Sequence, residues 1–466
     1  MKPIHGEDTI VALATAAGTA AIAVIRLSGP KAIAIADKIF IPKKGKNKSL
    51  SSSESHKLYF GTIEENGKLI DEVLLSLMKA PQSYTGEDTV EISCHGSAFI
   101  QQKILQLCCE SGARLAGPGE FTMRAFLNRK MDLSQAEAVA DLIASDSAIT
   151  HQLALKQMRG GFSFEIKMLR QKLIHLASLI ELELDFGEED VEFASRHDLK
   201  EVVVKLLTII EELIKSFELG NIIKKGIPVV IVGKPNAGKS TLLNALLNDN
   251  RAIVSETPGT TRDTIEEEIT LEGIKFRFID TAGLRETKDE IEMIGVAKAF
   301  EKMQDSPVIL YLFDAVVSKS DDLNQELLKL KSELNEKVRI IPVGNKIDMV
   351  SMAPIENKFT SIENLFLISA KEKTNIDKLR SYLLSLYGSG KIEANTSIVT
   401  SARHAEALKK TSEDLSRVYE GLEKKISNDF IAADLRQAMM HLGEITGEIS
   451  TEDLLENIFS KFCIGK

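Results

Sequence analysis

The pattern of hydrophobic and polar positions predicts the helices and strands of the chain. This pattern changes between strand-like and helical periodicity more than once along the sequence. Up to about residue 118, short apolar or alternating runs predict strands at 9–14, 20–27, 57–63, 69–78 and 89–94. Asn66-Gly67 separates two of these runs and favours a hairpin turn. Residues 98–110 have helical spacing, and the lysine- and serine-rich stretch 43–53 predicts a solvated loop. We therefore predict a small α+β domain.

Helical periodicity replaces this pattern between residues 120 and 221, where no proline occurs. Apolar residues at three- and four-residue steps form one stripe there: Leu169, Leu173, Leu176, Ile180 and Leu184. From residue 400 to 462 proline is again absent, and three leucines form a heptad-spaced row: Leu408, Leu415 and Leu422. Because two helical stretches flank a compact one, we predict that the middle domain is inserted into a helical domain.

The middle stretch opens with a phosphate-binding pattern. The β-branched run 229–232 predicts a strand, and the helical run 242–247 follows shortly after it. Between them, Gly233 to Ser240 has the spacing Gly-x-x-x-x-Gly-Lys-Ser. In this context backbone N–H groups turn towards a polyphosphate, Lys239 reaches the outer phosphates and Ser240 offers a hydroxyl to magnesium. A nucleotide site is therefore predicted at this turn.

Three further motifs each follow an apolar, strand-like run and identify the base. They are Asp280-Thr281-Ala282-Gly283, Asn345-Lys346-Ile347-Asp348 and Ser369-Ala370-Lys371. The Asp348 carboxylate can accept hydrogen bonds from the N1–H and the exocyclic amine of guanine, an edge that adenine lacks. The four motifs in this order predict a guanine nucleotide.

Composition limits the other functions that are possible. The 466 residues allow two to four domains. The formal charge of -10 disfavours a nucleic-acid platform held by bulk charge, although a local patch or a basic partner could still serve a nucleic-acid substrate. Four cysteines without metal-ligand spacing, no signal peptide and no long apolar run predict reduced thiols in a cytoplasmic protein with no membrane span.

The longer motifs resemble those of the MnmE (TrmE) family of tRNA-modification GTPases. The resemblance rests on GKPNAGKSTLLNAL, GTTRD and DTAGLRE in the middle stretch and on the tail Phe462-Cys463-Ile464-Gly465-Lys466. The N-terminal third adds signatures that begin at Asp8, Val24, Ser83, Gly119 and Arg124. The match spans the whole chain.

The resemblance implies a multidomain α/β architecture with four segments. Residues 1–118 would form an α+β folate-binding and dimerisation domain, and residues 222–387 an inserted Ras-like G domain. Residues 119–221 and 388–466 would form a discontinuous α-helical domain. The resemblance also implies a homodimer that acts with the FAD-dependent partner MnmG. Together they would add an aminomethyl or carboxymethylaminomethyl group at C5 of the wobble uridine of certain tRNAs, with a tetrahydrofolate derivative as the one-carbon source.

GTP hydrolysis of this kind depends mainly on positioning and charge neutralisation. Magnesium ligands would be Ser240 and Thr261. Leu284 directly follows Asp280-Thr281-Ala282-Gly283, at the position where Ras-like enzymes have a water-positioning glutamine. By resemblance, Glu286 would orient the water instead, although a solvated carboxylate is the alternative. No arginine finger can be identified, although Arg262 and Arg285 are nearby candidates. By resemblance, potassium bound between transiently paired G domains would take its place, with ligands at Asn236, Ser255, Thr257 and Thr260.

The remaining contacts to the nucleotide come from the same motifs. The predicted set is Asn236, Ala237, Gly238, Lys239, Ser240, Thr241, Ser255, Glu256, Thr257, Pro258, Gly259, Thr260, Thr261, Asp280, Thr281, Ala282, Gly283, Asn345, Lys346, Asp348, Ser369, Ala370 and Lys371.

The resemblance places folate contacts at Arg26, Glu87, Lys130 and Lys466, where a surface-charge role is the alternative. Cys463 becomes a candidate functional thiol that we expect to be exposed. Cys94-His95 could suggest a catalytic pair, but we expect a strand-end histidine satisfied by backbone.

The competing function is a ribosome-assembly GTPase of the Era or EngA type. Its G motifs would look similar, but such proteins carry a basic RNA-binding domain, whereas this chain is acidic.

Overall fold

The computed structural model describes residues 8–43, 49–185, 195–247, 266–272, 274–280, 303–304, 306–335, 338–350, 355, 357–388 and 398–465. Its contacts divide the chain into two compact units. One unit contains Met1–Ile143, Ala154–Thr208 and Ala407–Lys466, and the other contains Ala144–Leu153 and Ile209–Glu406. Among the described residues, no helix has the length and hydrophobicity that crossing a membrane requires.

The N-terminal third forms a seven-stranded sheet in the order β3-β4-β5-β6-β2-β1-β7. Its strands are β1 (Ile10–Leu13), β2 (Ala20–Ser28), β3 (Phe40–Pro42), β4 (Lys57–Glu65), β5 (Lys68–Met78), β6 (Thr89–Gly96) and β7 (Arg114–Leu115). The helices are α1 (Ala32–Ile39), the 3-10 turn η1 (Leu50–Ser52), α2 (Ala98–Glu110) and α3 (Glu120–Leu127). Every pairing is antiparallel except that of β1 with β7.

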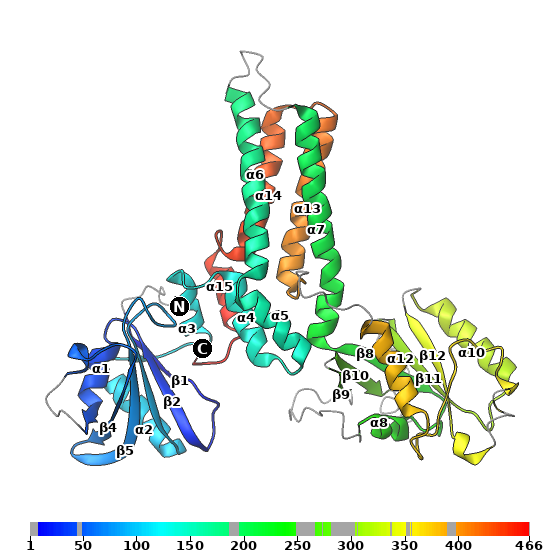
Figure 1. Ribbon diagram of the computed structural model, residues 1–466, viewed down its shortest axis with the longest axis horizontal. Coiled ribbons are helices and arrows are strands. Elements are labelled where there is room, and N and C mark those ends of the chain that lie inside the picture. The colour runs from blue at the N-terminus through cyan, green and yellow to red at the C-terminus, as the bar shows by residue number, and fades with distance from the viewer. Residues whose placement is uncertain are drawn as a thin grey trace, which may run out of the picture. The chain divides into compact units, whose positions relative to one another are not determined.

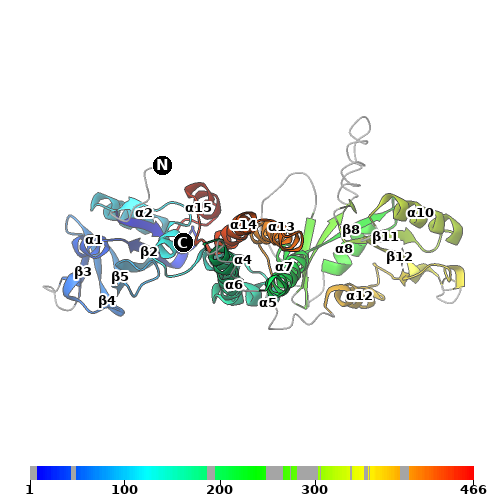
Figure 2. The ribbon, with the colours of Figure 1, turned by 90° about the horizontal axis from the view of Figure 1, so that it is seen from above.

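Alternation along the strands gives this sheet a covered face and an outer face. Alternate residues such as Ile25, Leu75 and Ile92 are fully buried and pack in one core with α1 and α2. Both helices lie on the same side of the sheet (Figure 2). On the outer face, α3 covers the β1 end, where Phe121 packs with Ile10.

One expectation for this domain needs correction. The stretch 43–53 was expected to be a solvated loop, but it includes η1, and Leu50 is only 2% exposed. Leu50 belongs to the core beneath the sheet, and its backbone N–H donates to Asp37 at 2.6 Å. A single leucine among lysines and serines is enough to anchor this turn, because its burial removes apolar surface from water.

Among the described residues, seven helices build the helical domain from two distant stretches of the chain. The first stretch supplies α4 (Leu133–Ala144), α5 (Ala148–Met158), α6 (Gly161–Asp185) and α7 (Arg196–Lys225). The second supplies α13 (Ala402–Glu423), α14 (Asn428–Thr446) and α15 (Glu452–Phe459). Figures 1 and 2 both show α6 beside α14. The Arg436–Glu181 ion pair, at 2.9 Å, joins these two helices.

The helical stripes lie where their spacing predicts. Leu169, Leu173, Leu176 and Ile180 on α6 are all buried, as are Leu408, Leu415 and Leu422 on α13. The side chain of Leu184, the last member of the α6 stripe, lies outside the described residues. The chain leaves this domain and returns to it at one place. There the Val399 N–H donates to the Ser216 hydroxyl at 3.1 Å, and a Cβ on Gly220 would collide with the Val399 carbonyl.

The chain between these points forms an α/β domain with the sheet order β13-β12-β11-β8-β10-β9. The strands are β8 (Ile227–Gly233), β9 (Glu266–Leu271), β10 (Ile274–Asp280), β11 (Val308–Asp314), β12 (Arg339–Asn345) and β13 (Phe366–Leu367). The helices are α8 (Lys239–Leu247), α10 (Ser320–Glu333), the 3-10 turn η3 (Ile347–Met349) and α12 (Ile376–Gly388). All pairings are parallel except that of β9 with β10.

Helices cover both faces of this parallel sheet. Leu242 of α8 and Leu379 of α12 pack in one core, and Leu323 and Leu327 of α10 pack in the other. The near-continuous apolar runs of β8 and β11 follow from burial on both faces. The multidomain α/β fold class with an inserted G domain is therefore confirmed. The four boundaries 1–118, 119–221, 222–387 and 388–466 stay predictions.

Candidate functional site

The phosphate loop joins β8 to α8, at the edge of the sheet where the carboxyl ends of parallel strands meet. Gly233 and Gly238 have φ values of 153° and 96°, and a Cβ would collide with the Leu312 carbonyl at the first and with the Asn345 amide at the second. Asn236 is also left-handed, with φ 62°. The two glycines are thus required by close backbone approach as well as by conformation.

Lys239 lies across its own loop. Its ammonium group donates to the carbonyls of Gly233, at 2.9 Å, and Lys234, at 3.2 Å. These contacts hold the charged nitrogen over the turn whose N–H groups would face a polyphosphate. Lys234 is held in turn by Glu326 of α10, at 2.5 Å, and Glu326 also accepts a hydrogen bond from the Tyr311 hydroxyl.

Asn345 connects the phosphate loop to the region predicted to bind the base. Its Nδ2 donates to the Ala237 carbonyl at 2.9 Å. Its Oδ1 accepts from the backbone N–H groups of Lys346, at 2.8 Å, and Ala370, at 2.9 Å. Asn345 is only 3% exposed, so one buried amide fixes three of the predicted motifs relative to one another.

Asp348 follows on η3 and is oriented by the last motif. The Ser369 hydroxyl donates to Asp348 Oδ1 at 2.6 Å and accepts from the Glu372 N–H at 3.1 Å. Lys346 pairs with Asp314 at 2.8 Å. Burial alone would raise the pKa of Asp314, but the hydrogen bond from Lys346 lowers it overall. A carboxylate and an ammonium group are thus both held beside the base site.

Several predicted site residues lie outside the described residues. They are Ser255, Glu256, Thr257, Pro258, Gly259, Thr260, Thr261, Thr281, Ala282, Gly283, Glu286 and Lys466. Asp280 ends β10, and its backbone alone is described. Within the described part of the chain, no three His, Cys, Asp or Glu side chains gather into a metal-binding group.

The N-terminal candidates gather on the outer face of the first sheet, close to α3. Arg26 Nε donates to Glu91 at 2.7 Å, and the guanidinium lies over the rings of Tyr84, at 5.5 Å, and Phe121, at 5.6 Å. The Lys130 ammonium group donates to the Pro81 carbonyl at 3.0 Å. Arg26 therefore lies against two aromatic rings, a setting that suits a planar ligand.

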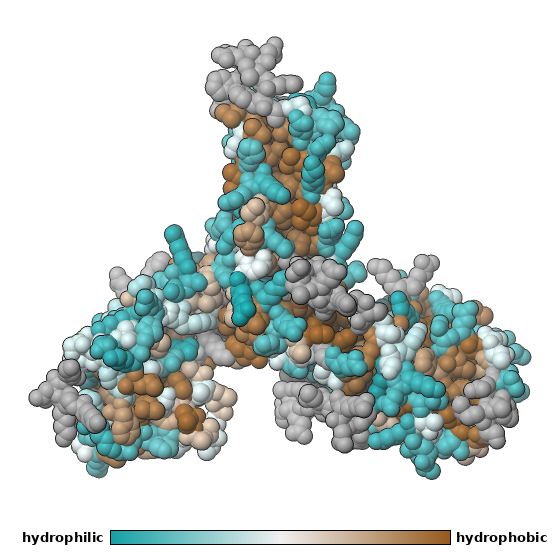
Figure 3. Space-filling model, in the orientation of Figure 1, coloured by the Kyte–Doolittle hydropathy of each residue, from teal (hydrophilic) through white to brown (hydrophobic). Residues whose placement is uncertain are grey.

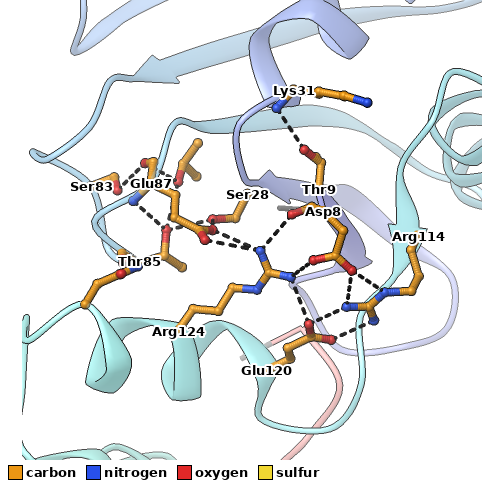
Figure 4. Close-up of polar contacts among 12 residues, drawn as sticks. Asp8, Thr9, Ser28, Lys31, Ser83, Thr85, Glu87, Arg114, Glu120 and Arg124 are labelled. Carbon is orange, nitrogen blue, oxygen red and sulfur yellow. Dashed lines mark hydrogen bonds and ion pairs between the residues drawn. The ribbon is translucent and has the colours of Figure 1, made fainter. Parts of the chain in front are cut away.

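Glu87 lies next to this group, in the loop before β6. Its Oε2 accepts from the Ser28 hydroxyl at 2.7 Å, and both of its oxygens contact Arg124 Nη1, at 3.2 and 3.3 Å (Figure 4). The Glu87 side chain is 14% exposed. The predicted carboxylate thus stays accessible, but protein groups fix its orientation.

A charged network that sequence reasoning missed extends from Glu87 (Figure 4). Arg124 Nη2 also contacts Asp8, at 2.7 Å, and Glu120, at 3.0 Å. Arg114 pairs with the same two carboxylates, at 2.8 and 2.6 Å. Burial alone would raise the pKa of Asp8 and of Glu120, but hydrogen bonds from the two arginines lower both overall. Only the four-residue spacing of Glu120 and Arg124 could have signalled this network.

The C-terminal tail is attached to the turn that precedes α3. The Gly119 N–H donates to the Cys463 carbonyl at 3.3 Å, and Ile464 forms a β-bridge with Pro118. Cys463 is exposed, as expected. The tail thus brings the candidate thiol next to the helix that carries Glu120 and Arg124.

The expectation for His95 is wrong. Its Nδ1 contacts the Asp71 carboxylate at 2.7 Å, and its backbone N–H donates to Asp71 at 2.8 Å, so a carboxylate satisfies this histidine where backbone was expected. Burial raises the pKa of Cys94 to about 11, and the nearby Asp71 adds to the rise. A thiol that stays protonated at neutral pH is a poor nucleophile, so a Cys94-His95 catalytic pair is not supported.

Comparison with known proteins agrees with these features. A family model described as the MnmE helical domain matches residues 133–463, and one described as the GTP-binding protein TrmE N-terminus matches residues 9–130.

Curated relatives with the name tRNA modification GTPase MnmE match the chain over nearly its whole length. Those of Flavobacterium johnsoniae and Cytophaga hutchinsonii are each 53% identical, over 99% and 98% of both chains respectively. That of Bacteroides fragilis is 49% identical over 99% of this chain and 100% of its own. This coverage favours the main interpretation over a ribosome-assembly GTPase of the Era or EngA type. With both family models matched and whole-length identity near one half, the chain belongs to the MnmE (TrmE) family of tRNA modification GTPases.

Proposed function

We propose that this chain, a GTPase of tRNA modification by its family, binds GTP with magnesium and potassium and hydrolyses it as part of wobble-uridine modification. The observation that carries the proposal is the Asn345 side chain, which joins the phosphate loop to the Ser369-Ala370 turn in a chain that matches relatives of this family over 99% of their length. Motifs that are linked in this way can hold both the phosphates and the base of a guanine nucleotide.

The described loop residues suit a polyphosphate with magnesium. Ser240 is exposed in the first turn of α8, and a hydroxyl is an oxygen ligand of the type that magnesium prefers. Lys239 and the loop N–H groups would hold the phosphates, while Thr261 and Asp280 would complete the metal site. Magnesium would neutralise charge on the phosphate oxygens. Asp348 and Lys346 would bind guanine, with Ser369, Ala370 and Lys371 closing that side.

Potassium would replace the missing arginine finger. Asn236 is exposed at the outer turn of the phosphate loop, and its left-handed backbone is compatible with an oxygen ligand that projects from the loop. Ser255, Thr257 and Thr260 would supply the further oxygens. The site is proposed to form when the G domains of two copies pair transiently.

Glu286 is proposed to orient the attacking water, because the position of a glutamine is taken by Leu284. Replacing Glu286 by Ala should slow single-turnover GTP hydrolysis by about 100-fold, in the range of a lost general base, and leave GTP affinity unchanged. Glu333→Ala, which removes an exposed carboxylate of α10 from outside the predicted nucleotide set, serves as the comparison. Equal hydrolysis rates in the wild-type and Glu286→Ala proteins would remove Glu286 from the mechanism.

The N-terminal domain is proposed to bind a tetrahydrofolate derivative. Arg26 lies over two aromatic rings, and Glu87 is a fixed carboxylate that can accept from the donors of a pterin. Lys130 and Lys466 would attract the anionic glutamate tail. The derivative would supply the one-carbon unit.

A homodimer is proposed to form through the outer face of the N-terminal sheet. Hydrophobic side chains gather over this sheet in Figure 3, and Ile22, Leu58, Phe60 and Leu74 are each at least 44% exposed. Exposed apolar groups of this size are typical of interaction surfaces. The outer face also carries Arg26, so dimerisation and ligand binding would share one layer of the domain.

The partner is proposed to be the FAD-dependent protein MnmG, and the reaction to take place on tRNA in the cytoplasm. The test is mass spectrometry of tRNA nucleosides from a deletion strain complemented with this chain or with its Lys239→Ala variant. We expect the aminomethyl-type wobble modification to be lost on deletion and restored only by the wild-type chain. Normal wobble nucleosides in the deletion strain, with accumulated ribosomal subunits, would contradict the proposal.

A further inference from the structure

Glu87 is held from one side and open on the other. Among the described residues, its side chain accepts hydrogen bonds from Ser28, at 2.7 Å, and from Arg124 Nη1, at 3.2 and 3.3 Å. A carboxylate has about four lone-pair sites. One site on Oε1 therefore remains for an outside donor, and the 14% exposure of the side chain gives that donor access.

Arg124 is the residue that holds Glu87, and it cannot turn elsewhere. Its side chain is 4% exposed, and Nη1 also donates to the Asp8 carbonyl at 3.0 Å. Nη2 bonds the carboxylates of Asp8, at 2.7 Å, and Glu120, at 3.0 Å. The rigid planar fork thus spans acceptors from three separate segments of the chain, as the centre of Figure 4 shows.

We infer that Arg124 is a positioning residue for the ligand of the N-terminal domain, because it fixes the Glu87 carboxylate and leaves a lone pair on Oε1 open. The inference rests on the proposed folate site and adds a residue to it. The ligand class is a pterin-type amide, whose N–H groups would donate to Glu87.

Charge, as well as hydrogen-bond geometry, fixes the orientation of the Glu87 carboxylate. Glu120 and Asp8 already share Arg114, so the negative charge of Glu87 depends on Arg124 alone within this network. Without the guanidinium, a carboxylate with 14% exposure would lose its cation and would turn towards water. A donor on the ligand would then meet a displaced acceptor.

Arg114 offers a matched control within the same network. It pairs with Asp8 and Glu120, the two carboxylates that Arg124 also contacts, but within the described part of the chain it makes no contact with Glu87. Arg114→Lys should therefore disturb the network and lower thermal stability without moving Glu87. A purely structural role for Arg124 predicts the same outcome for both arginines.

The experiment measures the affinity of the full chain for 5-formyltetrahydrofolate by titration calorimetry, in the wild type and in Arg124→Lys, Arg114→Lys, Glu87→Gln and the Arg124→Lys/Glu87→Gln double variant. We expect Arg124→Lys to raise Kd at least tenfold and Arg114→Lys to change it less than twofold. In the Glu87→Gln background, Arg124→Lys should have no further effect, because the two residues act as one unit. Ser28→Ala, which removes the other bond to Glu87, should raise Kd in the same direction.

Three results would overturn the inference. Equal Kd values for the wild type and Arg124→Lys would do so, as would additive effects of Arg124→Lys and Glu87→Gln. If Arg124→Lys does not fold, an unchanged Kd in Ser28→Ala decides against it. By contrast, no binding to the wild-type chain would overturn the folate proposal itself, and the inference with it.

Discussion

At the scale of single residues, the G domain depends on side chains that bond between motifs. Asn345 bonds Ala237 on one side and Ala370 on the other, and Ser369 orients Asp348. Each contact is a buried or half-buried hydrogen bond whose loss leaves a partner unsatisfied. We therefore propose that specificity for guanine resides in Asp348, whose carboxylate is oriented by the neighbouring turn.

Asp348→Asn should change the preferred base from guanine to xanthine. The carboxylate accepts from two guanine donors, whereas an amide can donate to the oxygen that xanthine carries in place of the exocyclic amine. Loss of a charge-assisted hydrogen bond costs about 1.5–3 kcal/mol, so GTP should bind about 10- to 150-fold more weakly. Competition of GTP and XTP against a fluorescent GDP measures this, with the exposed Asp377→Asn as control. Unchanged preference for GTP would contradict the assignment of the base site.

The arginine–carboxylate network should make the N-terminal domain sensitive to acid. The pKa values of Asp8 and Glu120 are lower in the folded chain than their ordinary values, because hydrogen bonds from Arg114 and Arg124 outweigh burial. Such groups stabilise the fold above their unfolded pKa, near 4, and lose that contribution as pH falls through the folded pKa. The urea midpoint should therefore fall between pH 5 and pH 3.

The urea midpoint of the Glu120→Gln variant should fall less between pH 5 and pH 3, because this substitution removes one of the titrating groups. The exposed Glu110→Gln is the control and should behave like the wild type. Near-UV circular dichroism follows urea unfolding at each pH. Identical pH profiles of the urea midpoint for Glu120→Gln and the wild type would show that the Glu120 carboxylate does not contribute to the loss of stability in acid.

The sequence could predict local contacts better than distant ones. Asn345 and Asp348 were identifiable because their motifs have fixed spacing at strand ends. Asp8 and Arg124 are 116 positions apart, and no periodicity indicates that a fold brings them together. The partner of His95 could not be predicted for the same reason. Asp71 lies on the neighbouring strand β5 and is distant from His95 in the sequence.

At the scale of elements, the pattern of apolar residues was sufficient to predict the long helices and the parallel strands. The stripe of α6 and the leucine row of α13 are buried as predicted, since 3.6-residue repeats leave little choice of face. Short elements were harder. The turn η1 contains a single buried leucine within a polar stretch, and one residue gives no period to detect.

Excision of the G domain can test whether it is inserted into the helical domain. The chain leaves and re-enters the helical domain where Ser216 and Gly220 contact Val399. Replacing residues 222–397 by a short Gly-Ser linker should leave a folded helical and N-terminal part, because the two ends of the gap already lie side by side. We expect helical circular dichroism and 5-formyltetrahydrofolate binding to persist and GTP binding to disappear. Lys239→Ala in the full chain is the control that loses GTP binding without the excision. An aggregated product would contradict the insertion.

At the scale of the whole molecule, the chain joins a nucleotide domain to a domain proposed to bind a one-carbon carrier. The G domain enters and leaves the helical domain at one joint, and the C-terminal tail returns to the turn before α3. Both proposed sites are therefore connected through the helical domain by the course of the chain. We propose that hydrolysis takes place at paired G domains, with a monovalent cation beside the phosphates.

The most direct test of this account is steady-state GTP hydrolysis by the full chain in potassium and in sodium at equal ionic strength, with Asn236→Ala measured alongside. The account predicts much faster hydrolysis in potassium, with light scattering that shows association of the GTP-bound chain in potassium. It also predicts that Asn236→Ala hydrolyses GTP at the same slow rate in both salts. Equal wild-type rates in potassium and sodium would contradict it.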